Sequence, residues 1–263
     1  MDMFVFGCSR VYRHFSLIHR TVIYYDLDII LNSMTNNLPA NYSWVKELGH
    51  YICEYIELQI NGDVVDYYNS QYLSLRKILL PASKFDSYNK LICNLPKYYN
   101  YDNTDKSNIS IILPLPFWFC RSIERALPLI SMQYIDVRIV VIFKQFNQCW
   151  WQLTEATPVG TPSITKANLI CNYVYLDVFE RQKMAANPMF EYLIEQFQIA
   201  PVSSIAATTL NYVAQVNFNH PVKELIWMYR AMEATAANDY YNYANILNYF
   251  TPTEVRYQPF DAL

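Results

Sequence analysis

Glycine is scarce in this chain of 263 residues, which contains only four. Phosphate-binding loops and flexible linkers use repeated glycines, because their backbone must approach a ligand closely or turn freely. The scarcity therefore argues against a glycine-rich nucleotide loop and against a flexible linker between domains.

Clustered metal ligands and catalytic motifs are missing as well. No two cysteines form a CxxC pair, and no GxSxG, HExxH or Walker sequence occurs. His50 and Glu54 are four residues apart, but no third ligand is in view. His220 lies in an Asn-His-Pro sequence, where a turn is favoured over catalysis. We therefore predict no enzyme, no catalytic residue, no cofactor and no metal site. The other two histidines are His14 and His19. The cysteines are widely spaced and are expected to be buried thiols: Cys8, Cys53, Cys93, Cys120, Cys149 and Cys171.

Positive charge and long apolar runs are limited. Twenty Lys and Arg stand against 23 Asp and Glu, a net charge of −3, so we expect no direct binding to nucleic acid. No apolar run reaches the ~20 residues of a membrane span, and we expect no signal peptide in the first eight residues, which have neither a basic start nor a long apolar run. A basic group near the start is expected to be a solvated arm, with a contact site as the alternative: Arg10, Arg13, His14, His19 and Arg20.

Strand-forming residues are abundant instead. Apolar residues make up 53% of the chain, and 24 residues are tyrosine. Apolar and polar residues alternate in residues 51–60, 134–143 and 170–178, which is typical of half-buried strands. Asn61-Gly62 separates two such runs and predicts a two-residue hairpin turn. An antiparallel β-sandwich over about residues 17–182 is the expected fold.

Residues 109–143 form the central stretch of the sequence. Pro114 and Pro116 place its first apolar block at an edge, a bend or a strand start. If that block continues as a strand, alternation puts Phe117 and Phe119 on one face and Trp118 on the other. We then expect one side to be core and the other to be an interface.

The last third predicts a helix and two strands. Asn187 and Pro188 suit a helix start, and apolar residues recur at helical spacing up to Phe197. Residues 208–218 and 222–230 are strand-like around the turn at His220. We expect these runs to be covered by another chain, to pack back on the sandwich, or to make the isolated chain poorly soluble.

Four blocks, found in one order between residues 17 and 230, carry a resemblance. They read GHYICEYIELQINGDVVD, LPLPFWFCRSIERALPLISMQYIDVRI, YVYLDVFER with EYLIEQ, and NFNHPVKELIW, and LIHR and Trp44 precede them. This pattern resembles the major capsid proteins of nucleocytoplasmic large DNA viruses, whose subunits are two consecutive jelly rolls that trimerise into capsomers. The resemblance implies an all-β fold with a first jelly roll in residues 1–182, a connector helix in 183–200 and the beginning of a second jelly roll in 201–263. Only 33 residues follow Arg230, too few for about eight strands, so we expect a partial or shortened copy that does not trimerise in isolation.

The resemblance implies a structural protein of an icosahedral capsid. Its expected partners are itself, as a homotrimer and in neighbouring capsomers, and minor capsid proteins; its expected location is the virion, after assembly in the host cytoplasm. Two alternatives stay open: a jelly-roll carbohydrate-binding module with Trp150 and Trp151 as a stacking platform, and a minor capsid or penton-type module. A metal-dependent cupin-type enzyme would need clustered ligands that the sequence does not supply.

Overall fold

The structure, a computed structural model, describes residues 3–7, 17–31, 42–100, 106, 109–132, 134–145, 148–152, 160–187, 189–200, 203–206, 209, 211–230 and 240–241. Side chains are described from residue 43 onward, except those of 150–163 and 165–166. The strands are β1 Met3–Gly7, β2 Leu17–Leu31, β3 Tyr42–Trp44, β4 Cys53–Ile60, β5 Asp63–Asn69, β6 Ile109–Pro114, β7 Val137–Phe143, β8 Trp150–Gln152 and β9 Gly160–Val174. The helices are α1 Leu48–Tyr51, α2 Ser70–Ile78, α3 Ala82–Leu91, α4 Pro96–Tyr99 and α5 Val178–Ala186, with 3₁₀ turns at Trp118–Cys120 and Ile123–Arg125.

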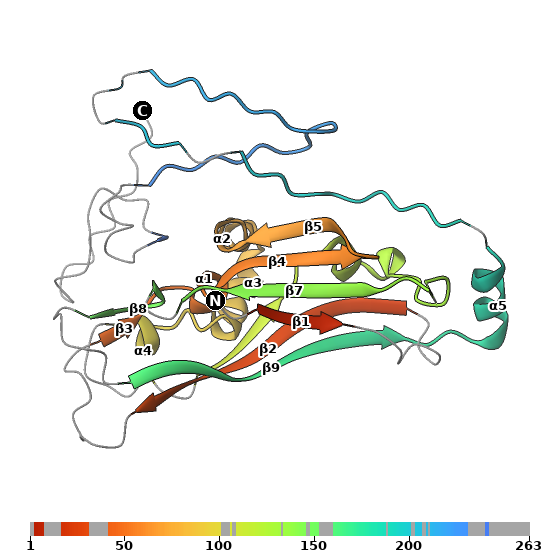
Figure 1. The fold of residues 1–263 in the computed structure, drawn as a ribbon, viewed down its shortest axis with the longest axis horizontal. Helices are drawn as coiled ribbons and strands as arrows, with labels where there is room; N and C mark the ends of the chain where they lie inside the picture. The colour runs from red at the N-terminus through yellow and green to blue at the C-terminus, as the bar shows by residue number, and fades with distance from the viewer. Residues whose placement is uncertain are drawn as a thin grey trace.

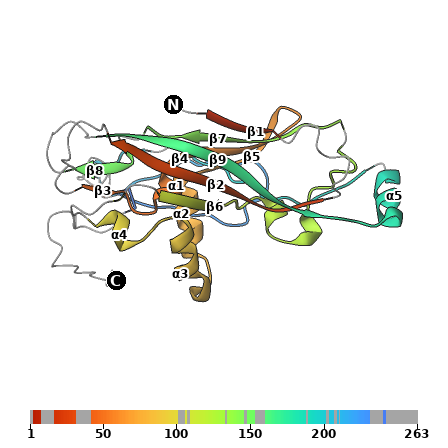
Figure 2. The ribbon, with the colours of Figure 1, turned by 90° about the horizontal axis from the view of Figure 1, so that it is seen from below.

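Two antiparallel sheets make up the body of the molecule. One has the strand order β1-β7-β4-β5, and the other has the order β6-β2-β9. A short third sheet pairs β3 with β8. The long strands β2 and β9 run side by side beneath the four-stranded sheet in Figure 1, and Figure 2 shows the same pair from below. The expected mostly-β, antiparallel architecture is therefore confirmed.

The core lies between the sheets. It contains alternate residues of β4, β7 and β6, and half-buried residues of β9 pack against it. Ile56 and Leu58 of β4 are fully buried, as their alternation predicts. Cys53 is buried too, although alternation predicts that it lies on the opposite face; a register shift between Cys53 and Tyr55 accounts for this difference.

The predicted hairpin is confirmed. Asn61 has φ 55° and Gly62 has φ 92°, so both turn residues adopt the positive φ values that an Asn-Gly turn tolerates. The turn joins Ile60 directly to its partner Asp63. The strand before it begins at Cys53 rather than at Tyr51, because Tyr51 is the last residue of α1. An additional strand, β1, pairs with β7 at the start of the chain, where the sequence predicted none.

The helix predicted after Asn187 is wrong in position. The helix is α5, and it begins after Asp177, whose side chain accepts a hydrogen bond from the backbone N–H of Glu180 at 2.8 Å. It ends at Ala186, because a residue before proline is pushed out of the helical region, and Asn187 has ψ 116°. Residues 189–200 contain no helix; they return as extended chain along the β5 side of the sandwich (Figure 1).

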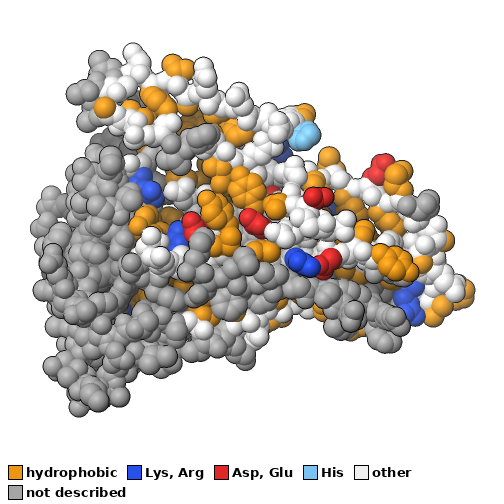
Figure 3. Space-filling model, viewed as in Figure 1, with side chains coloured by type: hydrophobic (Ala, Val, Ile, Leu, Met, Phe, Trp, Pro, Cys, Tyr) orange, Lys and Arg blue, Asp and Glu red, His pale blue; other side chains and the backbone are white. Residues whose placement is uncertain are grey.

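The strands predicted in residues 208–218 and 222–230 are also wrong as regular strands. Within residues 211–230 the structure assigns no strand, and the chain is extended without a ladder partner. Apolar side chains are at the surface here, with Val213 86% and Trp227 72% exposed. Figure 3 shows such side chains, in orange, on the segment that crosses the top of the view. Leu210 lies outside the described residues.

The run from Phe117 to Phe119 does not alternate. The strand β6 ends at Pro114, and Trp118–Cys120 form a 3₁₀ turn, so successive side chains no longer point to opposite faces. Phe117, Trp118 and Phe119 are all buried, at 0%, 3% and 1% exposure. The expected division between core and interface is therefore wrong.

Among the helices of the described part, none is both long and apolar enough to cross a membrane.

Candidate functional site

A close contact at Gly49 organises the most polar part of the interior, in residues 47–51, called the α1 corner below. A Cβ atom at Gly49 would lie 2.8 Å from Cγ2 of Ile111 and 3.0 Å from Cα of Ile92. The backbone N–H of Gly49 donates a hydrogen bond to the carbonyl of Ile92 at 3.0 Å. Glycine is required here, because a Cβ atom would force the Ile111 side chain and the Ile92 backbone to shift.

Glu47 begins the α1 corner in a left-handed conformation, with φ 53° and ψ 45°. Such a conformation is unfavourable for a residue with a side chain, and it persists where surrounding contacts fix it. The Glu47 carboxylate accepts hydrogen bonds from Lys77 of α2 and from His50 of α1. The backbone N–H of Glu47 also donates to the side chain of Asn94 at 3.4 Å.

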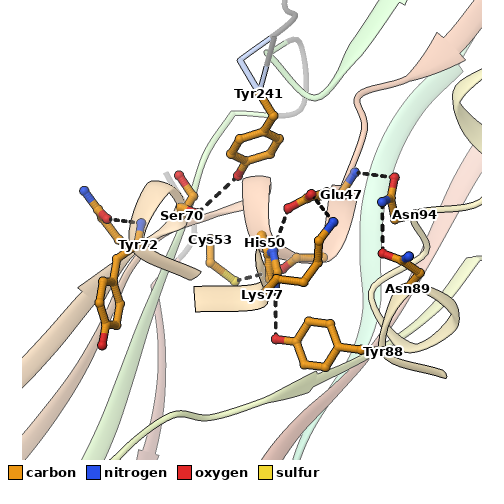
Figure 4. A network of polar contacts seen from close by, with 12 residues as sticks. Glu47, His50, Cys53, Ser70, Tyr72, Lys77, Tyr88, Asn89, Asn94 and Tyr241 are labelled. Atoms are coloured by element: carbon orange, nitrogen blue, oxygen red, sulfur yellow. Dashed lines mark hydrogen bonds and ion pairs between the residues drawn. The ribbon is translucent and has the colours of Figure 1, made fainter. Parts of the chain in front are cut away.

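His50 lies at the centre of this network and is completely buried (Figure 4). Its Nδ1 is 3.0 Å from Oε2 of Glu47, and its Nε2 is 3.0 Å from the hydroxyl of Tyr88. Because an ionised Glu47 only accepts, Nδ1 carries the proton and Nε2 accepts from Tyr88. Burial lowers the pKa of His50 below its usual value, and the nearby Glu47 offsets this only in part.

The pKa values of the other two groups follow from the same environment. Burial opposes ionisation of Glu47, but the hydrogen bonds of His50 and Lys77 and the positive charge of Lys77 outweigh it, so the pKa of Glu47 lies below its usual value. Burial, followed by the Glu47 charge, raises the pKa of Tyr88. A neutral histidine therefore lies between an ionised carboxylate and a neutral phenol.

This network ties three helices together. Glu47 and His50 belong to the α1 corner, Lys77 to α2 and Tyr88 to α3. His50 has no exposed surface and both its ring nitrogens are engaged, so the arrangement can hold helices in place but cannot reach a substrate. Lys77 and Tyr88 were missed from the sequence, because residues 67–88 show no regular pattern that would orient them.

The structure separates most of the residues that a metal site would need. His50 turns toward Glu47 and Tyr88, and it makes no ion pair with Glu54. His220 has φ 67°, which fits the predicted turn. No group of three or more potential metal ligands occurs in the described part of the chain. The side chains of His14 and His19, like the basic group near the start, lie outside the described side chains.

The described cysteines are present as thiols: Cys53, Cys93, Cys120, Cys149 and Cys171. Burial raises the pKa of Cys93 to about 12 and that of Cys149 to about 12. Such thiols are poor nucleophiles, because the thiolate is the reactive form. Trp150 and Trp151 lie on β8, but their side chains lie outside the described ones.

A second cluster surrounds Lys144, just after β7. Its Nζ donates to Oγ of Ser70 at 2.9 Å and lies 3.8 Å from the centre of the Tyr51 ring. Burial lowers the pKa of Lys144 to about 8. The Tyr51 ring stacks on Tyr240, at 4.2 Å between centres, and Arg230 donates to the carbonyl of Tyr240 at 3.0 Å. This cluster fastens residues near the end of the chain to the sandwich.

Comparison with known proteins identifies the family. The profile of the family described as "Major capsid protein N-terminus" matches residues 10–177, and that of "Large eukaryotic DNA virus major capsid protein" matches residues 180–262. The chain belongs to the major capsid protein family of large eukaryotic DNA viruses. The two matches follow each other in chain order and leave the corner at Gly49 and the aromatic run at 117–119 within the first.

Individual relatives agree with this assignment. "Capsid protein 1" of Acanthamoeba polyphaga mimivirus is 34% identical over 210 residues, which cover 74% of this chain and 34% of that protein. The "Major capsid protein" of Pyramimonas orientalis virus is 32% identical over 222 residues, which cover 83% of this chain and 50% of that protein. The chain thus spans between a third and a half of these two proteins.

A solved structure has the same fold. It is entitled "Crystal structure of PBCV-1 VP54 fitted into a cryo-EM reconstruction of the virophage Sputnik", and it matches with a TM-score of 0.57 at 22% identity. The match covers 75% of this chain and 43% of that one. It supports the capsid-type β fold of the described sheets.

Proposed function

We propose that this chain is a structural protein of the icosahedral shell of a large DNA virus, acting by geometry rather than by chemistry. The observation that carries the proposal is the pair of consecutive family matches, over residues 10–177 and 180–262. The interior is compatible with it, because His50 is completely buried and bonds Glu47 and Tyr88 through its two ring nitrogens, which fixes helices rather than presenting a reactive group.

In this proposal the sandwich is the first barrel of a double jelly roll. Residues 1–182 form that barrel, residues 183–200 connect the two barrels, and residues 201–263 begin the second. One feature supports this division: the exposed apolar residues beyond α5, such as Val213 and Trp227, are those that a second barrel would bury.

Copies of the chain would associate as trimeric capsomers that tile the shell, with minor capsid proteins as further partners. Two barrels side by side in each of three subunits give a nearly hexagonal outline, which packs without gaps on a flat face. The protein would be located in the virion after assembly in the host cytoplasm, and it would not contact the genome directly, consistent with its net charge of −3.

Chemical cross-linking of purified particles tests the association. Amine-reactive cross-linkers should give a ladder of this protein that stops at three copies under mild treatment. Recovery of the protein only as single copies, under conditions that cross-link other shell components, would contradict a trimeric capsomer.

A further inference from the structure

The edge strand β5 contains a β-bulge, and the bulged residue is hydrogen-bonded to a residue far along the chain. In the pairing of β4 with β5, Leu58 faces Asp66 and Gln59 faces Val64, so Val65 is an extra residue without a place in the register. The carbonyl of Val65 accepts a hydrogen bond from Nε2 of Gln196 at 2.7 Å. An edge strand presents unpaired backbone groups, and here a distant side chain satisfies one of them.

The next residue of β5 binds the backbone of the same distant segment. Asp66, only 2% exposed, accepts a hydrogen bond from the backbone N–H of Phe197 at 3.2 Å. Its carboxylate also accepts from the backbone N–H of Tyr67 at 3.0 Å and from the hydroxyl of Tyr68 at 2.5 Å. Asp66 therefore serves as a fixed acceptor for an incoming chain.

Phe197 fills an aromatic pocket beside this acceptor. Its ring centre lies 4.1 Å from that of Tyr72 and 6.2 Å from those of Tyr67 and Tyr68. Tyr68 is itself fully buried and packs on Phe117 of the core. A half-buried aromatic ring at such a position is a typical anchor of a docked peptide, because it buries a large apolar area.

Charges flank the anchor. Glu195 forms ion pairs with Arg121 of the sandwich and, at 2.5 Å, with Lys223 of the following segment. The hydrogen bonds of Lys223 and Arg121 lower the pKa of Glu195 to about 2. Gln198 and Asn219 also exchange two hydrogen bonds, at 3.1 and 2.9 Å. Residues 192–198, called the docking segment below, therefore lie between the sandwich and residues 219–223.

We infer that the edge of β5 is a receptor for the docking segment of the same chain, and that Phe197 and Glu195 hold the C-terminal part against the sandwich even when the connection through α5 is cut. The occupant is the chain's own segment, because every contact described above is already made within one copy. This inference does not depend on the capsid role, and it concerns an attachment inside one subunit.

Cutting the connection tests the inference. A site for a specific protease is inserted between Ala186 and Asn187, both exposed, and the folded chain is cut there. Size-exclusion chromatography over a dilution series then measures the dissociation constant of the two pieces. We expect the cut wild-type chain to elute as one species. Phe197→Ala should raise the dissociation constant at least tenfold, and Leu193→Ala, at a residue 88% exposed on the same segment, should change it less than twofold.

A second variant covers the case in which Phe197→Ala fails to fold. Glu195→Gln keeps the size of the side chain and removes its charge, so it should weaken the association several-fold and reduce its dependence on salt. Separation of the cut wild-type pieces, equal effects of Phe197→Ala and Leu193→Ala, or no effect of Glu195→Gln together with none of Phe197→Ala would overturn the inference. So would light scattering that shows a dimer of the uncut chain which Phe197→Ala converts to a monomer, since the segment would then dock on a second copy.

Discussion

Gly49 packs so closely against Ile111 that a Cβ atom on the glycine would lie 2.8 Å from Cγ2 of the isoleucine. Ile111 is a fully buried residue of β6, and Gly49 belongs to α1, so this contact fixes the distance between the helical corner and the second sheet. Gly49 and His50 thus have two separate structural roles. The glycine permits the close approach to Ile111, and the histidine forms hydrogen bonds to Glu47 and Tyr88 that connect α1 with α3.

Replacing Gly49 with alanine should destabilise the fold by about 1–3 kcal/mol, because overpacking forces backbone and side chains to shift. Chemical denaturation monitored by tryptophan fluorescence measures this free energy of unfolding. Gly62→Ala is the matched control: its φ of +92° is also unfavourable for alanine, but nothing lies within 4 Å of a Cβ there. Gly62→Ala should therefore lose stability through backbone strain alone and show no change in the signals of core residues. Equal effects on the core would contradict the steric explanation.

The stability of the protein should fall as the pH is lowered below about 6.5. Since burial lowers the pKa of His50, the unfolded chain binds a proton at the usual histidine pKa while the folded chain does not. Stability is then fully present above pH 6.5 and is lost as the pH falls toward the folded pKa, with a slope of up to about 1.4 kcal/mol per pH unit. Glu47, whose pKa is lowered, adds a further loss at more acidic pH, below its usual value of 4.5.

His50→Gln should be less stable at pH 7.5 and should lack the slope between pH 6.5 and the folded pKa. His220→Gln, in an exposed turn, should retain the wild-type slope. Urea unfolding at a series of pH values provides the measurement. A slope that survives in His50→Gln would mean that another group causes it.

Lys144 should affect the stability of the protein at alkaline pH. Its pKa is lowered to about 8 by burial, so the folded chain releases this proton before the unfolded chain does. The contribution of Lys144 to stability should therefore rise between about pH 8 and its usual value of 10.5. Lys144→Met should remove that rise, whereas Lys84→Met, at an exposed lysine of α3, should not. The two variants are compared by the same urea titrations, and identical curves would refute the role of Lys144.

Phe117→Ala should destabilise the isolated chain by about 3–5 kcal/mol, because it removes a fully buried ring that packs on Tyr68 and Phe119. Trp118→Ala should also lower the stability of the isolated chain, since Trp118 is buried within it. Thermal unfolding checks both variants. If Trp118→Ala left the melting temperature unchanged, the placement of Trp118 in the core of the isolated chain would be contradicted.

Local patterns predicted the sandwich well. The hairpin at Asn61-Gly62 and the buried faces of β4 and β7 follow from alternation and turn chemistry, which are local properties of the sequence. The helix near residue 187 was misplaced because two capping signals compete, and Asp177 caps a helix that Pro188 then terminates. The polar network was not predictable, because Lys77 and Tyr88 meet Glu47 only through tertiary packing. The site at the edge of β5 depends in the same way on Val65 and Gln196, which are 131 residues apart.

The aromatic run at Phe117 shows a further limit of pattern reading. Alternation assumes a strand, and the prolines at 114 and 116 end β6 before the aromatic residues begin. The resemblance to a capsid family, by contrast, could be found from the sequence, because it depends on the residue identities and the order of four blocks and not on how each block folds.

Immunogold electron microscopy of purified virus particles tests the central claim most directly. Antibodies raised against the purified 263-residue chain are applied to intact particles and to particles whose shell has been removed. The proposed role predicts dense labelling over the shell of intact particles and its loss when the shell is removed. Labelling that remains with the core, or particles without label while infected cells contain the protein, would contradict the role in the capsid.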